Sequence, residues 1–316
     1  MNNTLNRQIS CLLGFIFLSS LAYASGDGWI VDFEKAQEIA AKDKKDILMD
    51  FTGSDWCGYC IQLDKNVFSQ DEFKTKIPHH FVLLKLDFPK DTSKQTKEEI
   101  EQNKQLNKEY QISGYPTILL TDASGRPYAK TVGYGGDSAE EYSSKLIDMQ
   151  KSRIQRDAFF AKADAAQGIE KAKFLDQAIS LFDEEMALSV YRKEIEQIMA
   201  LDANDEAKLK SKYENVILLQ DIKEQINEIL KANSTDPAAC VEALTKIHED
   251  KKPTGAPAME ILYIRAFMKF QSKDMEGARA DLEAAIQANP ESPRVNEIQE
   301  IIQRVFKNQE ANKQAQ

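Results

Sequence analysis

The sequence pattern changes near residue 150, and this change limits the folds that the chain can adopt. Residues 25–150 contain nine glycines and both tryptophans, whereas residues 151–316 contain three glycines and no tryptophan. In the first part, short apolar runs alternate with segments of helical periodicity, which is typical of an α/β domain with a central sheet. The second part shows helical periodicity alone and predicts an all-α domain over residues 151–306.

The first part contains four predicted strands and four predicted helices. The runs that suit strands are residues 47–51, 81–86, 117–121 and 128–132. The segments that suit helices are residues 33–44, 57–68, 98–110 and 138–150. Residues 122–125 (Asp-Ala-Ser-Gly) form a turn signal, so we expect the last two strands to pair as a hairpin.

The second part contains a segment that fits a repeated helical hairpin. Residues 259–292 match the 34-residue tetratricopeptide pattern, with Leu282 in the second helix and Pro290 at the turn. The match is partial, because Arg265 stands where the pattern prefers an apolar residue. We therefore predict a helical, tetratricopeptide-like region that ends in a flexible polar tail over residues 307–316.

The first 24 residues have the three-part layout of a secretory signal peptide. A polar start, whose only charged side chain is Arg7, precedes the apolar run 11–21 and the small-x-small sequence of residues 22–24. A membrane-spanning helix needs about 20 apolar residues, so the short run favours cleavage over an anchor. We expect a periplasmic or secreted protein whose remaining cysteines meet an oxidising compartment.

The overall composition excludes several classes of protein. A formal net charge of -10, from 41 basic and 51 acidic residues, argues against nucleic-acid binding, which usually requires a basic patch. A single long apolar run excludes a membrane protein with several spans. Four cysteines among 316 residues are too few for a scaffold held by disulfides.

The cysteine pair in Trp56-Cys57-Gly58-Tyr59-Cys60 is the most informative motif. It follows an apolar strand and begins a helix, the context in which C-x-x-C is typical of a redox pair. Because unpaired N–H groups at a helix N-terminus stabilise a thiolate, we predict that Cys57 is the nucleophile. Cys57 would hold an exposed position, whereas Cys60, one turn deeper, would be shielded and would resolve the mixed disulfide. Two other interpretations stay open: an inert structural disulfide and half of a metal site.

Three elements in this order resemble the thioredoxin superfamily: Asp50-Phe51 at a strand end, the cysteine pair, and Gly114-Tyr115-Pro116-Thr117 before a later strand. The resemblance covers residues 29–150 and extends to exported bacterial thioredoxin-like and disulfide-isomerase-like proteins. It implies a thioredoxin-like domain over residues 25–150, with a mixed sheet flanked by helices. It also implies that Pro116 is cis and that the Tyr115 backbone faces a bound substrate strand.

Each residue around the pair has a functional and a structural interpretation. Burial would raise the pKa of Asp50 and let it accept the proton of Cys60, or Asp50 is a hydrogen-bonded carboxylate at a strand end. Lys85 either modulates Asp50 or faces solvent, and Cys240 is a buried thiol or forms an intermolecular disulfide. The expected substrate-binding residues are Trp56, Tyr59, Tyr115 and Pro116, although Trp56 would also suit the core.

Two features depart from thioredoxin itself. The spacing from Asp50 to Cys57 is one residue longer, so we expect a different turn before the cysteine pair. Residues 88–110 form a longer and more charged segment than the corresponding one in thioredoxin. This segment could place an extra helix beside the site and change its substrate preference.

These features predict an exported thiol-disulfide oxidoreductase that uses Cys57 and Cys60 in the isomerase or the reductase direction. We expect no cofactor and no metal. The expected partners are protein thiols and disulfides and a membrane-bound or soluble redox partner, but no nucleic acid. The sequence predicts no oligomeric state. Two rival functions are a helical-repeat interaction module on a thioredoxin-like scaffold and a protein that delivers copper or zinc.

Overall fold

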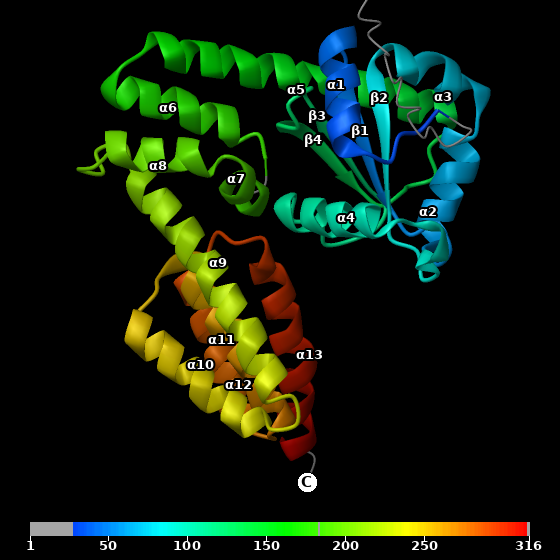
Figure 1. Cartoon of the computed structure of the whole chain (residues 1–316). Coiled ribbons are helices and arrows are strands. Elements are labelled where there is room, and N and C mark those ends of the chain that lie inside the picture. Colours follow the sequence, from blue (N-terminus) through cyan, green and yellow to red (C-terminus); the bar gives the residue numbers. More distant parts are fainter. Residues whose placement is uncertain (1–27, 183, 315–316) are drawn as a thin grey trace, which may run out of the picture. The chain divides into compact units, whose positions relative to one another are not determined.

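The computed structural model describes residues 28–182 and 184–314 (Figure 1). The predicted signal peptide at residues 1–24 lies outside the described residues. The chain divides into two compact units. Among the described residues, the first contains residues 28–103, Gly114–Gly125 and Lys130–Ser144, and the second contains Lys104–Ser113, Arg126–Ala129 and those from Lys145.

The first unit is built on a four-stranded sheet with the order β2-β1-β3-β4. The strands are β1 (Asp46–Thr52), β2 (Phe81–Asp87), β3 (Thr117–Thr121) and β4 (Pro127–Val132). β1 runs parallel to β2 and antiparallel to β3, so the predicted mixed sheet is confirmed. All four strands lie within one residue of the predicted bounds.

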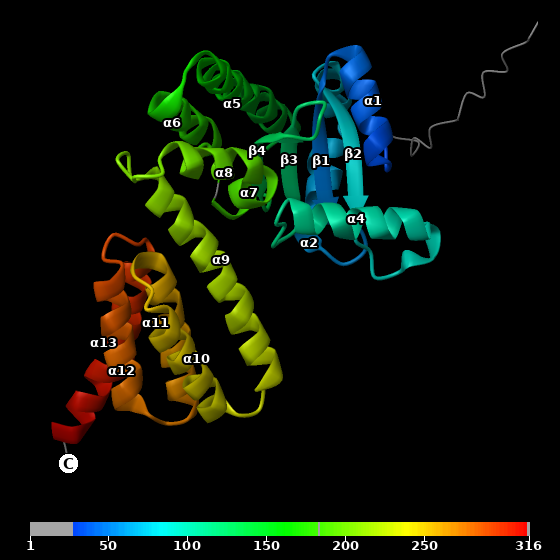
Figure 2. The ribbon, with the colours of Figure 1, turned by 60° about the vertical axis from the view of Figure 1, so that its left-hand side comes forward.

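Helices and short turns connect these strands (Figure 2). They are α1 (Phe33–Asp43), α2 (Gly58–Leu63), the π-helix η1 (Asp64–Phe68), α3 (Asp71–Lys76), the 3-10 turns η2 (Ile77–His79) and η3 (Thr92–Lys94), and α4 (Lys97–Glu109). The single helix expected over residues 57–68 is therefore an α-helix that continues as a π-helix. The short helix α3 was not predicted, because six residues carry too little periodicity to stand out.

The core of the first unit lies on the faces of the central strand. Every residue of β1 is buried, as expected for a strand with helices on both faces. The ring of Trp29, which is 2% exposed, packs against Phe68 and Phe73 at centroid distances of 5.0 and 6.3 Å. Ile30 pairs with Leu84 and so extends the outer edge of β2. These contacts fix β1, which leads into the cysteine pair, and β2, which leads into the loop that follows Asp87.

From Lys145 onwards, the described residues form helices and connecting turns, which confirms the predicted all-helical region. The helices are α5 (Ala139–Ala165), α6 (Gly168–Ile179), α7 (Glu184–Val190), α8 (Arg192–Leu201), α9 (Leu209–Ala232), α10 (Pro237–Lys251), α11 (Gly255–Gln271), α12 (Met275–Ala288) and α13 (Arg294–Gln314). The helix expected to end at residue 150 continues to Ala165, because no glycine or proline interrupts it. The backbone of residues 307–314, expected as a tail, is helical in α13.

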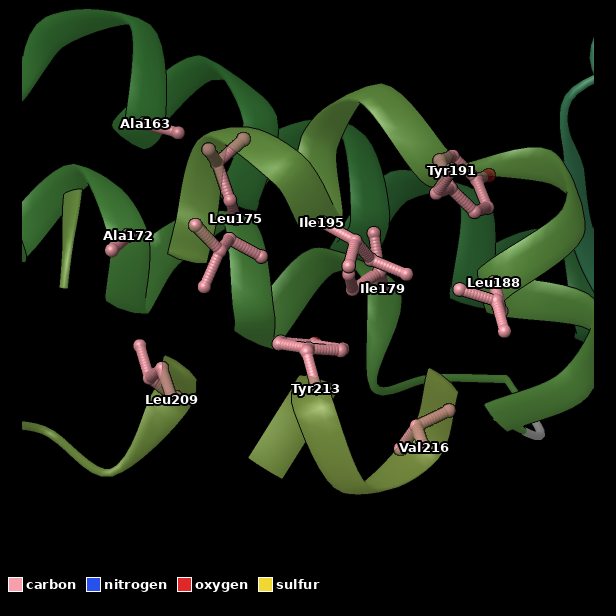
Figure 3. Close-up of a cluster of buried hydrophobic side chains, with 11 residues drawn as sticks. Ala163, Ala172, Leu175, Ile179, Leu188, Tyr191, Ile195, Leu209, Tyr213 and Val216 are labelled. Carbon is pink, nitrogen blue, oxygen red and sulfur yellow. The ribbon is translucent and has the colours of Figure 1, made fainter. Parts of the chain in front are cut away.

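Apolar side chains hold the second unit together in several clusters. One lies among α6, α8 and α9, where Leu175, Ile195 and Tyr213 point toward one another (Figure 3). Others join α9 to α10 and α11, and α11 to α12 and α13. α11 and α12 form a helical hairpin within residues 255–288. Its assignment to the tetratricopeptide class stays a prediction.

Candidate active site

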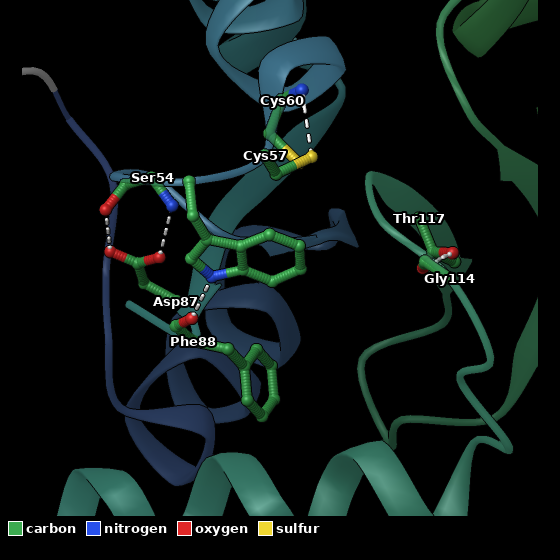
Figure 4. Close-up of a disulfide and its surroundings, with 8 residues drawn as sticks. Ser54, Cys57, Cys60, Asp87, Phe88, Gly114 and Thr117 are labelled. Carbon is green, nitrogen blue, oxygen red and sulfur yellow. Dashed lines mark hydrogen bonds between the residues drawn. A yellow bond between two sulfur atoms is a disulfide. The ribbon is translucent and has the colours of Figure 1, made fainter. Parts of the chain in front are cut away.

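The cysteine pair lies at the junction of β1 and α2. β1 ends at Thr52, four residues turn the chain, and Cys57 caps the N-terminus of α2. The Sγ of Cys57 accepts a hydrogen bond from the backbone N–H of Cys60 at 3.2 Å. The two cysteines form a disulfide (Figure 4). An N–H group that already points at Cys57 Sγ would also stabilise a thiolate there.

Whole-residue exposure distinguishes the two cysteines less than we expected. Cys57 is 6% exposed and Cys60 is 3% exposed. The difference between them lies instead in their positions, because Cys57 is the cap residue and Cys60 is inside the helix. Cys240, the third described cysteine, is a free thiol buried in α10, with its Sγ 3.5 Å from the carbonyl oxygen of Asn233.

Aromatic side chains pack against Trp56, the residue directly before the pair. The Trp56 ring meets the edge of the Tyr115 ring at a centroid distance of 5.7 Å, and Tyr115 lies 5.3 Å from the Phe88 ring. Trp56 is 42% exposed and Tyr59 is 61% exposed, so Trp56 is not a core residue. Ile61, also on α2, is exposed as well. An exposed apolar group of this kind beside a reactive pair is suited to contact another polypeptide.

The loop before β3 has the conformation that the resemblance implied. The peptide bond between Tyr115 and Pro116 is cis. Thr117 Oγ1 donates to the carbonyl oxygen of Gly114 at 2.8 Å (Figure 4), and Gly133 N–H donates to the carbonyl oxygen of Pro116 at 2.8 Å. Pro116 is buried, whereas Tyr115 is half-buried. The loop is thus fixed by one hydrogen bond within it and by a second from the residue directly after β4.

Asp50 is a buried carboxyl group in the middle of β1. It is 2% exposed, and its Oδ1 makes no hydrogen bond with any described residue. Burial raises the pKa of Asp50 from 3.8 to about 7; the Lys85 ammonium opposes this shift, and the carboxylates of Asp64 and Asp87 add to it. The structure gives no hydrogen bond between Asp50 and either cysteine. Asp50 is therefore a group that can gain or lose a proton near neutral pH.

Several residues around the site were missed by the sequence analysis. Ser54 donates two hydrogen bonds to Asp87, and the indole N–H of Trp56 donates to the carbonyl oxygen of Phe88 at 2.8 Å. One signal was available: β1 and β2 are both short apolar runs, and Asp87 is the polar residue directly after the second run. The carboxyl ends of two parallel strands meet at one edge of a sheet, which places Asp87 near the turn that follows β1.

The described residues contain no group of three or more His, Cys, Asp or Glu side chains arranged to hold a metal ion. In the same part of the chain, none of the helices combines the length and the apolar composition that a membrane span requires.

Comparison with known proteins matches residues 33–150 to the thioredoxin-like domain model. The disulfide bond reductase DsbH of Chlamydia pneumoniae is 31% identical over 121 residues, which are 38% of this chain and 72% of that protein. The thiol:disulfide interchange protein DsbD of Campylobacter jejuni is 28% identical over 134 residues, which are 42% of this chain and only 21% of that protein. A solved structure titled DsbH oxidoreductase aligns with a TM-score of 0.38 and 26% identity, over 48% of this chain and 95% of that one.

The matched residues contain every element of the site: the strand with Asp50, the cysteine turn and the cis-proline loop. Since a relative above 30% identity is also covered over most of its length, the chain belongs to the thioredoxin-like family.

Proposed function

We propose that this protein is an exported disulfide reductase that donates electrons from Cys57 and Cys60 to disulfides of other proteins. The observation that carries the proposal is the cysteine pair at the start of α2, with Cys57 Sγ already hydrogen-bonded to a backbone N–H. The named activity of the DsbH relative supports the reductase direction. The predicted signal peptide, with its short apolar run, supports export.

In the first half of the reaction, the Cys57 thiolate attacks one sulfur of a substrate disulfide. A bond forms between Cys57 Sγ and that sulfur, the substrate S–S bond breaks, and the other substrate sulfur leaves as a thiolate that takes a proton. In the second half, Cys60 loses its proton and attacks Cys57 Sγ. The Cys57–Cys60 disulfide forms, and the first substrate sulfur leaves as the second thiol. The substrate gains two electrons, and the protein loses two.

Asp50 would act as the acceptor of the Cys60 proton. A base is needed because the thiol of Cys60 is buried and only the thiolate is nucleophilic. A carboxyl group with a pKa near 7 is partly ionised at neutral pH and can both accept and return a proton. Water or a small side-chain movement would have to bridge the two groups, since they share no direct hydrogen bond in the oxidised form.

The substrate polypeptide would lie on the exposed aromatic face beside the pair. Trp56 and Tyr59 offer apolar surface, and Tyr115 supports Trp56 from the cis-proline loop. Pro116 would shape the backbone against which the substrate strand lies. The oxidised pair must then be reduced by a second dithiol protein, soluble or membrane-bound, and the helical unit would bind this partner or large substrates.

The decisive test is the equilibrium of the Cys57–Cys60 pair with glutathione. A reductase should have a midpoint potential more negative than about -200 mV, whereas a value near about -120 mV would instead indicate an oxidase. The protein should also reduce a disulfide-bonded protein in the presence of dithiothreitol. The variant in which both Cys57 and Cys60 are alanine is the matched control, and equal rates for the two proteins would reject the proposal.

A further inference from the structure

Two carboxylates hold the turn between β1 and α2. The first is Asp87, at the end of β2. Its Oδ1 accepts from the backbone N–H of Ser54 at 2.9 Å, and its Oδ2 accepts from the Ser54 hydroxyl at 2.5 Å (Figure 4). Both oxygens of one side chain thus bind a single residue of the turn, three positions before Cys57. A charge-assisted, two-point contact of this kind fixes orientation as well as distance.

The next two residues of the turn bind the same loop. The carboxylate of Asp55 accepts from the backbone N–H of Lys90 at 2.9 and 3.0 Å and from that of Asp91 at 3.1 Å. The indole N–H of Trp56 donates to the carbonyl oxygen of Phe88 at 2.8 Å. Residues 54–56 and residues 87–91 therefore form one continuous set of contacts, which we call the turn clamp.

The clamp determines where the Trp56 ring lies. A Cβ atom added to Gly53 would come within 2.5 Å of the indole, so the ring packs directly on the Gly53 backbone. Its other neighbour is Tyr115, and its N–H is bound to Phe88. Trp56 is 42% exposed, yet its orientation is fixed on three sides. A side chain that is ordered before binding loses less conformational entropy when a partner arrives.

The backbone of Asp87 is itself fixed by hydrogen bonds from two side chains. Its carbonyl oxygen accepts from the side-chain amides of Gln95 and Asn103, both at 3.0 Å. Asn103 is 1% exposed, so this contact is shielded from water. The main chain of the preceding residues is fixed by pairing with β1. The segment that departs from thioredoxin in length thus supports the carboxylate that binds the cysteine turn.

We propose that Asp87 is a positioning residue for disulfide exchange. Through Ser54 it fixes the turn that carries Trp56 and Cys57, so that a substrate polypeptide binds to a Trp56 ring that is already ordered. The inference rests on the proposed function for its substrate, but the clamp itself can be tested without that substrate. Loss of the clamp should free the Trp56 ring and weaken binding of a polypeptide disulfide. A small reductant, which does not need to bind Trp56, should reduce the Cys57–Cys60 disulfide almost as fast as before.

The central variant is Ser54→Ala, which removes one hydrogen bond and changes no charge. Ser54→Thr keeps the hydroxyl and serves as the conservative rescue. Asp87→Ala removes both acceptors but also removes a negative charge near Asp50. Asp71→Asn is the control for net charge, since Asp71 is an exposed carboxylate at the first residue of α3 and is not part of the turn clamp. If Asp87→Ala does not fold, the comparison of Ser54→Ala with Ser54→Thr still completes the test.

The first measurement is quenching of tryptophan fluorescence by iodide in the oxidised protein. Trp29 is 2% exposed, so the quenched signal belongs to Trp56. We expect Ser54→Ala and Asp87→Ala to raise the quenching constant about twofold or more, as expected when a ring fixed by hydrogen bonds becomes mobile. Ser54→Thr and Asp71→Asn should match the unaltered protein. Unchanged quenching in both clamp variants would overturn the proposal, whatever the substrate of the protein is.

The second measurement separates binding from chemistry. With a disulfide-bonded protein as substrate, we expect the clamp variants to raise KM on the order of tenfold while kcat changes much less, because positioning is lost and chemistry is kept. Their reduction by dithiothreitol should stay within about twofold of the unaltered protein. An equal loss with dithiothreitol and with the protein substrate would overturn the proposal. An unaltered protein that reduces no protein disulfide would instead reject the proposed function, and the iodide experiment would still report on the clamp.

Discussion

Asp50 of β1 and Lys85 of β2 are register partners on adjacent parallel strands, yet the Lys85 ammonium lies 3.7 Å from Asp64 Oδ1. Lys85 is thus shared between a buried carboxyl group and a carboxylate at the start of η1. The ammonium lowers the pKa of Asp50, but burial outweighs it and leaves the pKa at about 7. The pKa of Asp50 therefore depends on two opposing effects, burial and the Lys85 charge, and a single substitution can shift it in either direction.

The first prediction concerns Lys85→Met. Removal of the nearby positive charge disfavours the carboxylate, so the pKa of Asp50 should rise above its present value of about 7. The rate of disulfide exchange should then reach its plateau at a higher pH, which a pH–rate profile measures. Lys74→Met, an exposed lysine on α3, is the matched control. Superimposable profiles for all three proteins would contradict the assigned role of Lys85.

The second prediction concerns stability and the charge on Asp50. Because the pKa of Asp50 in the folded protein lies above 3.8, the folded protein binds this proton more tightly than the unfolded chain does. The contribution of Asp50 to the free energy of unfolding is thus fully present below pH 3.8 and decreases as the pH rises toward about 7. Asp50→Asn should be more stable than the parent at pH 8, by roughly 2 to 4 kcal/mol.

The same substitution should slow disulfide exchange on the order of 100-fold, the usual cost of losing a general base. Denaturant unfolding of the oxidised proteins at pH 5 and pH 8 measures the first effect, and exchange kinetics measure the second. If the stability difference between Asp50→Asn and the parent is the same at both pH values, Asp50 ionises freely in the folded state and the assigned pKa is wrong. The substitution would thus exchange activity for stability, as expected where an active site carries a buried ionisable group.

The sequence was sufficient to predict the bounds of the strands and the position of the cysteine pair at the start of a helix. The run at residues 81–86, for example, is apolar because both faces of β2 are largely covered, and the strand extends only to Asp87. The turn clamp could not be predicted in the same way. Ser54 and Asp87 are 33 residues apart, and they meet only because β1 and β2 run parallel with Thr52 opposite Asp87. The strand ends place Asp87 near the turn, but the register that brings it to Ser54 is a long-range property of the sheet, set by the buried faces of both strands and the segments that connect them.

Helix bounds were predicted less well than strand bounds. α5 extends 15 residues past the predicted end at residue 150, since helical periodicity alone does not mark a domain boundary. Arg156 of that helix is 2% exposed and donates to the carbonyl oxygen of Pro127 at 3.1 Å, a contact that only the folded chain reveals. The predicted boundary at residue 150 and the roles of the site residues remain predictions.

The third prediction concerns a buried ion cluster in the second unit. Asp281 of α12 binds Arg265 at 2.6 Å and Lys269 at 2.9 Å, both of α11, and is almost fully buried. Asp281→Ala would leave two partly buried cations without their carboxylate. We expect a loss of about 3 kcal/mol in the free energy of unfolding, measured with urea.

The control for this prediction lies on the same helix. Glu283 forms an exposed pair with Arg279 at 2.9 Å, so Glu283→Gln should change stability by no more than about 0.5 kcal/mol. Equal effects of the two substitutions would indicate that the Asp281 cluster is as well solvated as a surface pair.

The last prediction concerns the division of labour between the cysteines. In the reduced protein, Cys57 should be alkylated first, because its sulfur receives the Cys60 N–H and a thiolate is favoured there. Cys240 should be alkylated last, because burial and the nearby Asp236 raise the pKa of its thiol. A Cys60→Ala variant should then trap substrate proteins as mixed disulfides, since Cys57 can still attack and no second thiol releases the substrate. Such complexes, released by reductant, should be absent when Cys57 is also replaced by alanine. If both variants trap the same amount of protein, Cys57 is not the attacking residue.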